Sequence, residues 1–99
     1  VAKFDKLDGQ IKFTQVDNTH VQIEGQLNKG FTDTDPSNYH ADIGGFIDFT
    51  FAQLGVVITP PGTAPFKANI PGDVTLLIGQ TLTITHTDTP LDSAEIKSG

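Results

Sequence analysis

Two neighbouring segments near the start of the chain alternate apolar and polar residues, and this pattern restricts the fold more than any other feature. In residues 9–16, Gly9, Ile11 and Phe13 are separated by polar residues, and in residues 20–27 every second position is apolar or glycine. Alternation with a period of two is typical of a strand that buries one face. The intervening Asp17-Asn18-Thr19 has the side chains that favour tight turns. We therefore predict an antiparallel β-hairpin here.

Further short strands are expected along the rest of the chain. The segments with strand character are residues 46–51, 56–59, 66–70 and 81–89, with partial alternation at 74–78. Pro90 is expected to end the 81–89 strand, leaving a tail with a last short strand at 95–96. Residues 45–55 also fit a short helix, and this alternative stays open at the level of sequence.

Loops rich in proline, glycine, aspartate and threonine separate these segments, most clearly at residues 29–38, 60–65 and 71–72. No helix of ordinary length is visible, and glutamate occurs only twice. A chain of 99 residues forms one domain. We predict a single all-β domain over residues 1–99, a small antiparallel β-sandwich or Greek-key barrel of six to eight short strands.

Charge and missing residue types exclude several classes of protein. The chain has 12 acidic residues against 6 lysines, no arginine, and a net charge of -6. Such a chain is a poor ligand for nucleic acid. Cysteine is absent, which excludes disulfides and cysteine-ligated metals, and no run approaches the ~20 apolar residues that span a membrane. The absence of Cys and Met, with many Thr and Asx residues, favours an extracellular protein.

Three histidines and one aspartate are the candidate metal ligands. His86 lies in phase with the apolar positions of its strand, while His20 lies on the polar face of the predicted hairpin. His40 and Asp42 follow the loop of residues 29–38, called the acidic loop below. Neutral imidazoles and carboxylates bind copper or zinc. A structural or solvated histidine is the alternative at each position, and no two histidines have ligand spacing.

Four segments resemble the copper/zinc superoxide dismutase-like domain. Residues 9–15 (GQIKFTQ) and 21–27 (VQIEGQL) are similar to the opening hairpin of that family. Residues 72–74 (GDV) and 78–86 (IGQTLTITH) are similar to its later G-D…I-G-R-T-L-V-V-H strand. The resemblance implies a β-sandwich, with His40 and Asp42 at the family's copper-binding H-x-H-E segment.

The departures from that family bear on activity. Asp42 stands where the family has a second copper histidine, and one extra residue separates Gly79 from His86. The family's bridging histidine, zinc loop, cysteines and guiding arginine have no counterpart. The resemblance thus implies a shortened relative that keeps the sandwich and has lost the dismutase site.

These observations favour a non-catalytic, secreted binding module with a protein or cell-surface polysaccharide partner. Exposed edge strands make a homodimer one option. The alternative is a copper- or zinc-binding protein that uses His40 and His86 with Asp42 or His20. A third hypothesis, a protease inhibitor presenting residues 59–66, depends on loop composition alone.

Overall fold

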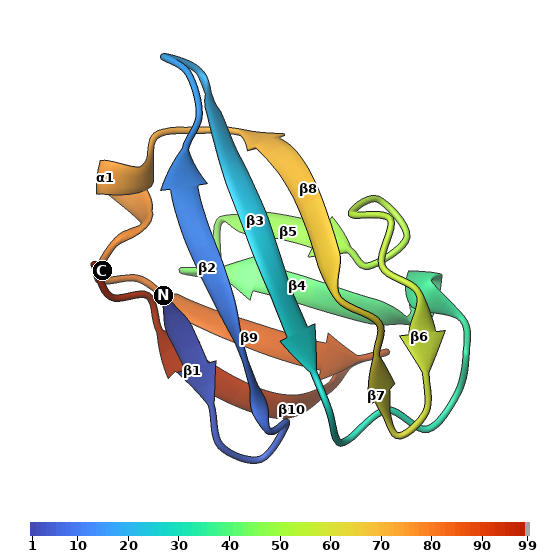
Figure 1. Ribbon diagram of the computed structural model, residues 1–99. Helices are drawn as coiled ribbons and strands as arrows, with labels where there is room; N and C mark the ends of the chain where they lie inside the picture. The colour runs from blue at the N-terminus through green and yellow to red at the C-terminus, as the bar shows by residue number, and fades with distance from the viewer. Residues whose placement is uncertain (99) are drawn as a thin grey trace.

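Two antiparallel sheets pack against each other as a β-sandwich in the computed structural model, which describes residues 1–98 (Figure 1). Sheet A has the order β1 (Ala2–Phe4), β2 (Gly9–Gln15), β3 (His20–Leu27) and β8 (Phe66–Pro71). Sheet B has the order β10 (Thr89–Glu95), β9 (Thr81–His86), β4 (Tyr39–Ile43) and β5 (Ile47–Thr50). The smaller elements are the hairpin of β6 (Ile58–Thr59) and β7 (Gly62–Thr63), the 3₁₀ turn η1 (Pro36–Asn38) and the helix α1 (Val74–Leu77).

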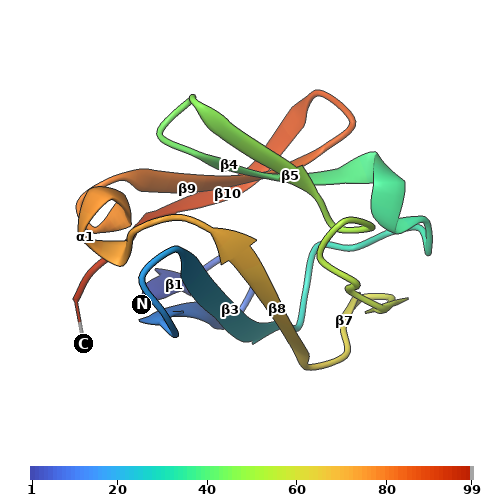
Figure 2. The same ribbon diagram turned by 90° about the horizontal axis from the view of Figure 1, so that it is seen from above.

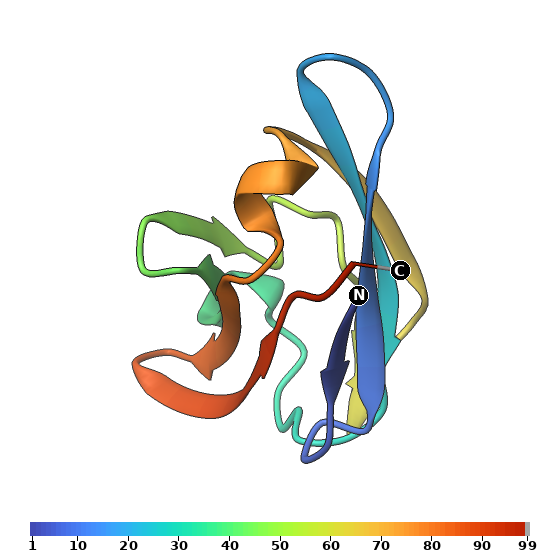
Figure 3. The same cartoon turned by 90° about the vertical axis from the view of Figure 1, so that its left-hand side faces the viewer.

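The predicted fold class is confirmed. Of the ten strands in residues 1–98, β1, β6 and β7 have only two or three residues, and the other seven have four to eight. Viewed from above, sheet B and sheet A form two separate layers (Figure 2). The segment after β10 lies beside the start of β1 (Figure 3), where the Lys97 N–H donates to the Val1 carbonyl over 3.0 Å.

The predicted hairpin is present as β2 and β3, paired from Gly9↔Leu27 to Gln15↔Val21. Its alternate residues behave as the pattern requires: Ile11, Val21 and Ile23 are buried, while their polar neighbours face outward. The core between the sheets contains these side chains together with apolar residues of sheet B. Those of sheet B include Tyr39, Ala41, Ile43, Leu82 and Ile84.

A short helix replaces the partial alternation expected at residues 74–78. The Asp73 side chain accepts a hydrogen bond from the Thr75 N–H at 2.9 Å and so caps the first turn of α1. Only Leu77 of the helix is buried, whereas Leu76 and Ile78 are exposed. The local cap decides the conformation here, because alternation over so few residues is a weak signal.

The end of the chain corrects a second prediction. The strand expected over 81–89 ends at His86, and the chain turns back through Thr87, whose φ is +53°. Pro90 then lies inside β10 rather than ending a strand. β10 is the outermost strand of sheet B, a position that tolerates a residue without an N–H. Most of the predicted tail is therefore strand.

The ambiguous residues 45–55 form strand β5 and then a series of turns, not a helix. Phe51, Leu54 and Val56 in and after these turns are buried. The Phe51 ring lies 6.4 Å from that of Phe66 on β8, which places this segment against the first residue of that strand. Within residues 1–98, no helix has the length and apolar character needed to cross a membrane.

Candidate functional site

Each of the three histidines contacts one aspartate. The ring–carboxylate distances are 3.0 Å for His20–Asp17, 3.0 Å for His40–Asp48 and 2.6 Å for His86–Asp33. The three pairs lie in different parts of the fold, so each is described separately below.

His86 holds the acidic loop against sheet B. It lies opposite Tyr39 in the β4–β9 register, and the two rings stack with centroids 4.4 Å apart and planes 12° apart. Its Nε2 contacts Asp33 Oδ2, and its side chain is 27% exposed. The buried Tyr39 hydroxyl accepts hydrogen bonds from the Thr32 and Asp33 N–H groups. These contacts give His86 a structural role at the rim of the core.

His40 lies on the opposite face of sheet B from His86. The register pairs Tyr39 with His86 and His40 with Thr85, and successive residues of a strand point to opposite faces. His40 shares an outer hollow of about 200 Å³ with Asp42 and Asp48. Asp42 and Asp48 are direct cross-strand neighbours, and His40 Nδ1 contacts the carboxylate of Asp48.

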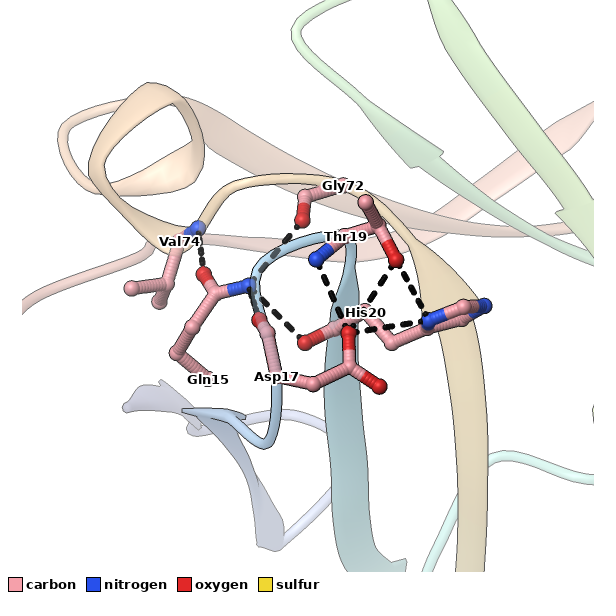
Figure 4. Close-up of polar contacts among 6 residues, drawn as sticks. All are labelled: Gln15, Asp17, Thr19, His20, Gly72 and Val74. Carbon is pink, nitrogen blue, oxygen red and sulfur yellow. Dashed lines mark hydrogen bonds and ion pairs between the residues drawn. The ribbon is translucent and has the colours of Figure 1, made fainter.

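His20 begins β3 in the other sheet and belongs to a local turn network (Figure 4). Asp17 Oδ1 accepts from the Thr19 N–H at 2.8 Å and lies 3.0 Å from His20 Nδ1. Gln15 joins this hairpin tip to the chain before α1. Its Nε2 donates to the His20 and Gly72 carbonyls, and its Oε1 accepts from the Val74 N–H at 2.7 Å.

The structure therefore brings only two of the four predicted metal ligands together, His40 and Asp42. His86 points to the other face of the same sheet, and His20 is in sheet A. Across residues 1–98, no three or more His, Asp or Glu side chains are grouped so that they could hold a metal ion.

Hydrogen bonds lower the pKa of several loop aspartates. For Asp17 the main cause is the Thr19 N–H, followed by the His20 ring. For Asp33, burial is the largest single influence and acts to raise the pKa. Hydrogen bonds from the Asp35 N–H, the His86 ring and the Asn38 side chain, together with the charge of His86, outweigh it, so the pKa of Asp33 lies below its usual value.

The outer face of sheet A presents three rows of hydrogen-bonding side chains. The cross-strand rows are Lys3–Gln10–Gln26, Lys12–Glu24–Lys67 and Thr14–Gln22–Asn69. Glu24 accepts from Gln22 at 3.2 Å and lies 3.5 Å from Lys67. An open hollow of about 640 Å³ lies over this face, lined among others by Gln10, Lys12, Gln26 and Lys67.

The two outer faces differ in charge. The strands of sheet A direct three lysines and one glutamate outward, a local balance of +2 within a chain of net charge -6. The outer face of sheet B bears Asp42, Asp48 and Glu95, and the strands of that sheet contain no lysine. The sequence placed Gln22, Glu24 and Gln26 on one polar face, but it did not place Lys67 beside them, because β8 lies about forty residues away along the chain.

No family model, no curated protein and no solved structure matches this chain. The resemblance to the copper/zinc superoxide dismutase-like domain therefore stays a prediction.

Proposed function

We propose that this chain is a secreted, non-catalytic binding module and that it binds an anionic cell-surface polymer on the outer face of sheet A. The observation that carries the proposal is the set of three side-chain rows on that face, which combine lysines with primary amides. The rows span four neighbouring strands and so offer repeated contacts to an extended ligand.

The chemistry of these side chains suits a polymer of sugar acids. A primary amide both donates and accepts hydrogen bonds, so Gln10, Gln26 and Asn69 can pair with hydroxyl groups. Lys12 and Lys67 supply ammonium groups for carboxylates. These side chains suit a protein partner less well. Stable protein interfaces centre on aromatic or aliphatic side chains, and the three rows contain none.

Local charge also favours binding of an anionic ligand on the outer face of sheet A over binding elsewhere on the surface. An anionic ligand is repelled by the net charge of -6, whereas the balance of +2 on sheet A attracts it at short range. Salt screens such contacts, since the Debye length falls from about 10 Å at 0.1 M to about 3 Å at 1 M ionic strength. Binding should therefore weaken as salt is added.

Calorimetric titration with polygalacturonate, and with a neutral glucan of similar length, tests the proposal. The double variant Lys12→Gln/Lys67→Gln should lose at least about tenfold in affinity for the anionic polymer. Lys29→Gln/Lys97→Gln is the matched control, because it removes the same charge from residues outside sheet A. Equal losses in both variants, or tighter binding of the neutral glucan, would show that the lysine rows do not form the binding face.

A further inference from the structure

Strand β8 forms one edge of sheet A and leaves backbone groups unpaired. Gly72 N–H donates to the Thr19 carbonyl at 2.8 Å, which identifies residues 19 and 72 as a hydrogen-bonded pair of the β3–β8 ladder. Hydrogen bonding alternates along an antiparallel ladder. Phe66, Ala68 and Ile70 therefore bond to β3, while Lys67 and Asn69 direct their N–H and C=O groups outward.

The β2–β3 hairpin gives the same assignment independently. Val16 N–H donates to the His20 carbonyl at 3.0 Å, so the even-numbered residues of β3 bond to β2. The odd-numbered residues Val21, Ile23 and Gly25 are then left for β8, where they face Ile70, Ala68 and Phe66. Neither outward N–H of β8 has an acceptor among residues 1–98. Buried N–H groups are almost always paired, so these two reach water.

Each of the other three edges of sheets A and B has a feature that interrupts strand addition. At β5, the Thr50 N–H donates to Gln53 Oε1 at 2.8 Å. At β10, the register shifts between Pro90 and Asp92. Strand β1 has three residues and lies against the end of the chain, where Lys97 bonds to Val1. Such devices are how sheet proteins avoid edge pairing, and β8 keeps a regular stretch without them.

We propose that β8 pairs antiparallel with β8 of a second copy of this chain, with Ala68 on the two-fold axis. In this register Lys67 N–H donates to the Asn69 carbonyl of the second copy, and Asn69 N–H donates to its Lys67 carbonyl. The symmetry repeats both bonds, so every outward N–H between Pro65 and Pro71 is paired.

The prolines are what point to a second copy rather than to an unrelated strand. Pro65 and Pro71 are each three residues from Ala68, and neither has an N–H. With the two-fold axis at Ala68, Pro65 of each copy lies opposite Pro71 of the other copy, at the positions where the next hydrogen bonds would form. The edge is thus complementary to itself, and the ladder ends at both sides without an unpaired donor.

The side chains of β8 permit this approach. Lys67 faces Asn69 of the second copy rather than another lysine, and each Lys67 already has Glu24 as a neighbour at 3.5 Å. β8 contains no carboxylate, so the acidic charge of the chain is kept away from the contact. The small Ala68 meets its own copy on the inner side of the sheet. Pairing would make one eight-stranded sheet, with the lysine and amide rows of both copies on a continuous face. This pairing does not depend on which ligand that face binds.

Sedimentation velocity over a range of protein concentrations tests the proposal. A short strand contact buries little surface, so we expect a monomer–dimer equilibrium in the micromolar to millimolar range. Asn69→Pro removes an outward N–H at an edge position that tolerates proline, and it should abolish the dimer. Asn69→Ala keeps the N–H and should leave the dimer intact.

Amide hydrogen exchange of the unmodified chain keeps the test decisive even where Asn69→Pro does not fold. The Lys67 and Asn69 amides should become protected as concentration rises, whereas the Ala68 amide should be protected throughout. A chain that is monomeric at all concentrations would overturn the proposal. So would a dimer without protection at Lys67 and Asn69, or protection of these amides only by a different protein.

Discussion

Tyr39 and His86 lie opposite each other on β4 and β9 with their rings stacked, and Asp33 Oδ2 contacts Nε2 of the imidazole. The cluster joins residues that are up to 53 positions apart in the sequence. It fixes the acidic loop on the edge of the core, because ring stacking and a hydrogen bond to a carboxylate act on the same histidine.

Replacing His86 by alanine should therefore destabilise the protein. Loss of the stack and of the contact with Asp33 is expected to lower the free energy of unfolding by about 1–3 kcal/mol. Urea denaturation followed by circular dichroism measures this change. His20→Ala is the control and should change stability by less than about 0.5 kcal/mol, since His20 is exposed at a hairpin tip. Equal losses in the two variants would contradict a structural role specific to His86.

The Tyr39 hydroxyl gives a second prediction. It is the acceptor for the Thr32 and Asp33 N–H groups at 3.0 and 3.3 Å. Tyr39→Phe keeps the ring stack but removes this acceptor, which should cost about 1–2 kcal/mol of stability. Hydrogen exchange at the Thr32 and Asp33 amides should accelerate, while the Ile84 amide should keep the protection of the folded sheet. Unchanged exchange at both loop amides would show that the hydroxyl does not hold them.

The loop aspartates predict how stability depends on acid. The pKa values of Asp33, Asp35 and Asp73 are lowered in the folded chain; for Asp35 and Asp73 the main cause is hydrogen bonding from Ser37 and Thr75. A carboxyl with a lowered folded pKa stabilises the fold above its unfolded pKa, near 3.8. That contribution is lost as the pH falls through the folded value.

Thermal unfolding between pH 6 and pH 2 measures this dependence. The melting temperature should be nearly constant down to about pH 4–5 and should then fall. Asp73→Asn should reduce the steepness of the fall, because it removes one carboxylate that contributes. A melting temperature that rises on acidification would contradict the prediction.

Two glycines differ in the space around them and give a matched pair of variants. A Cβ on Gly62 would lie 2.4 Å from the Leu27 carbonyl oxygen, whereas a Cβ on Gly79 would meet nothing within 4 Å. Gly62→Ala should cost roughly 1–3 kcal/mol or more through overpacking against the backbone. Gly79→Ala should cost about 1–2 kcal/mol, because its φ of +91° strains any residue with a Cβ. Comparable urea midpoints for wild type and Gly62→Ala would show that the backbone of β7 can move away.

Metal titration tests the alternative of copper or zinc binding. Since His40 and His86 point to opposite faces of sheet B, one ion cannot contact both. Calorimetry with Zn²⁺ or Cu²⁺ should show that any binding lost in His40→Ala is retained in His86→Ala. A stoichiometric site lost in each single variant would mean that the two imidazoles share an ion, contrary to the register of β4 and β9.

At the candidate sites, the sequence predicts which side chains of one strand share a face, but it does not predict which strands are paired. Alternation placed Gln22 and Glu24 on one face correctly, because side-chain direction along a strand depends only on residue parity. Lys67 joins them only through the β3–β8 pairing. Similarly, His40 and His86 are both predicted metal ligands. The β4–β9 register pairs His86 with Tyr39 rather than with His40, and this offset of one residue puts the two imidazoles on opposite faces of sheet B.

Strands β1, β4 and most of β10 were not predicted from the sequence. The sequence by itself determined the hairpin of β2 and β3, strand β8, and the buried faces of β2, β3 and β9. These follow from local alternation and turn chemistry, which do not require knowledge of distant residues. Only the tertiary structure decided which strands are neighbours, which charges gather on each outer face, and which edge remains open. Those properties depend on hydrogen bonds between segments far apart in the chain, and the free energy of such pairing is shared by the whole fold rather than encoded in any one segment.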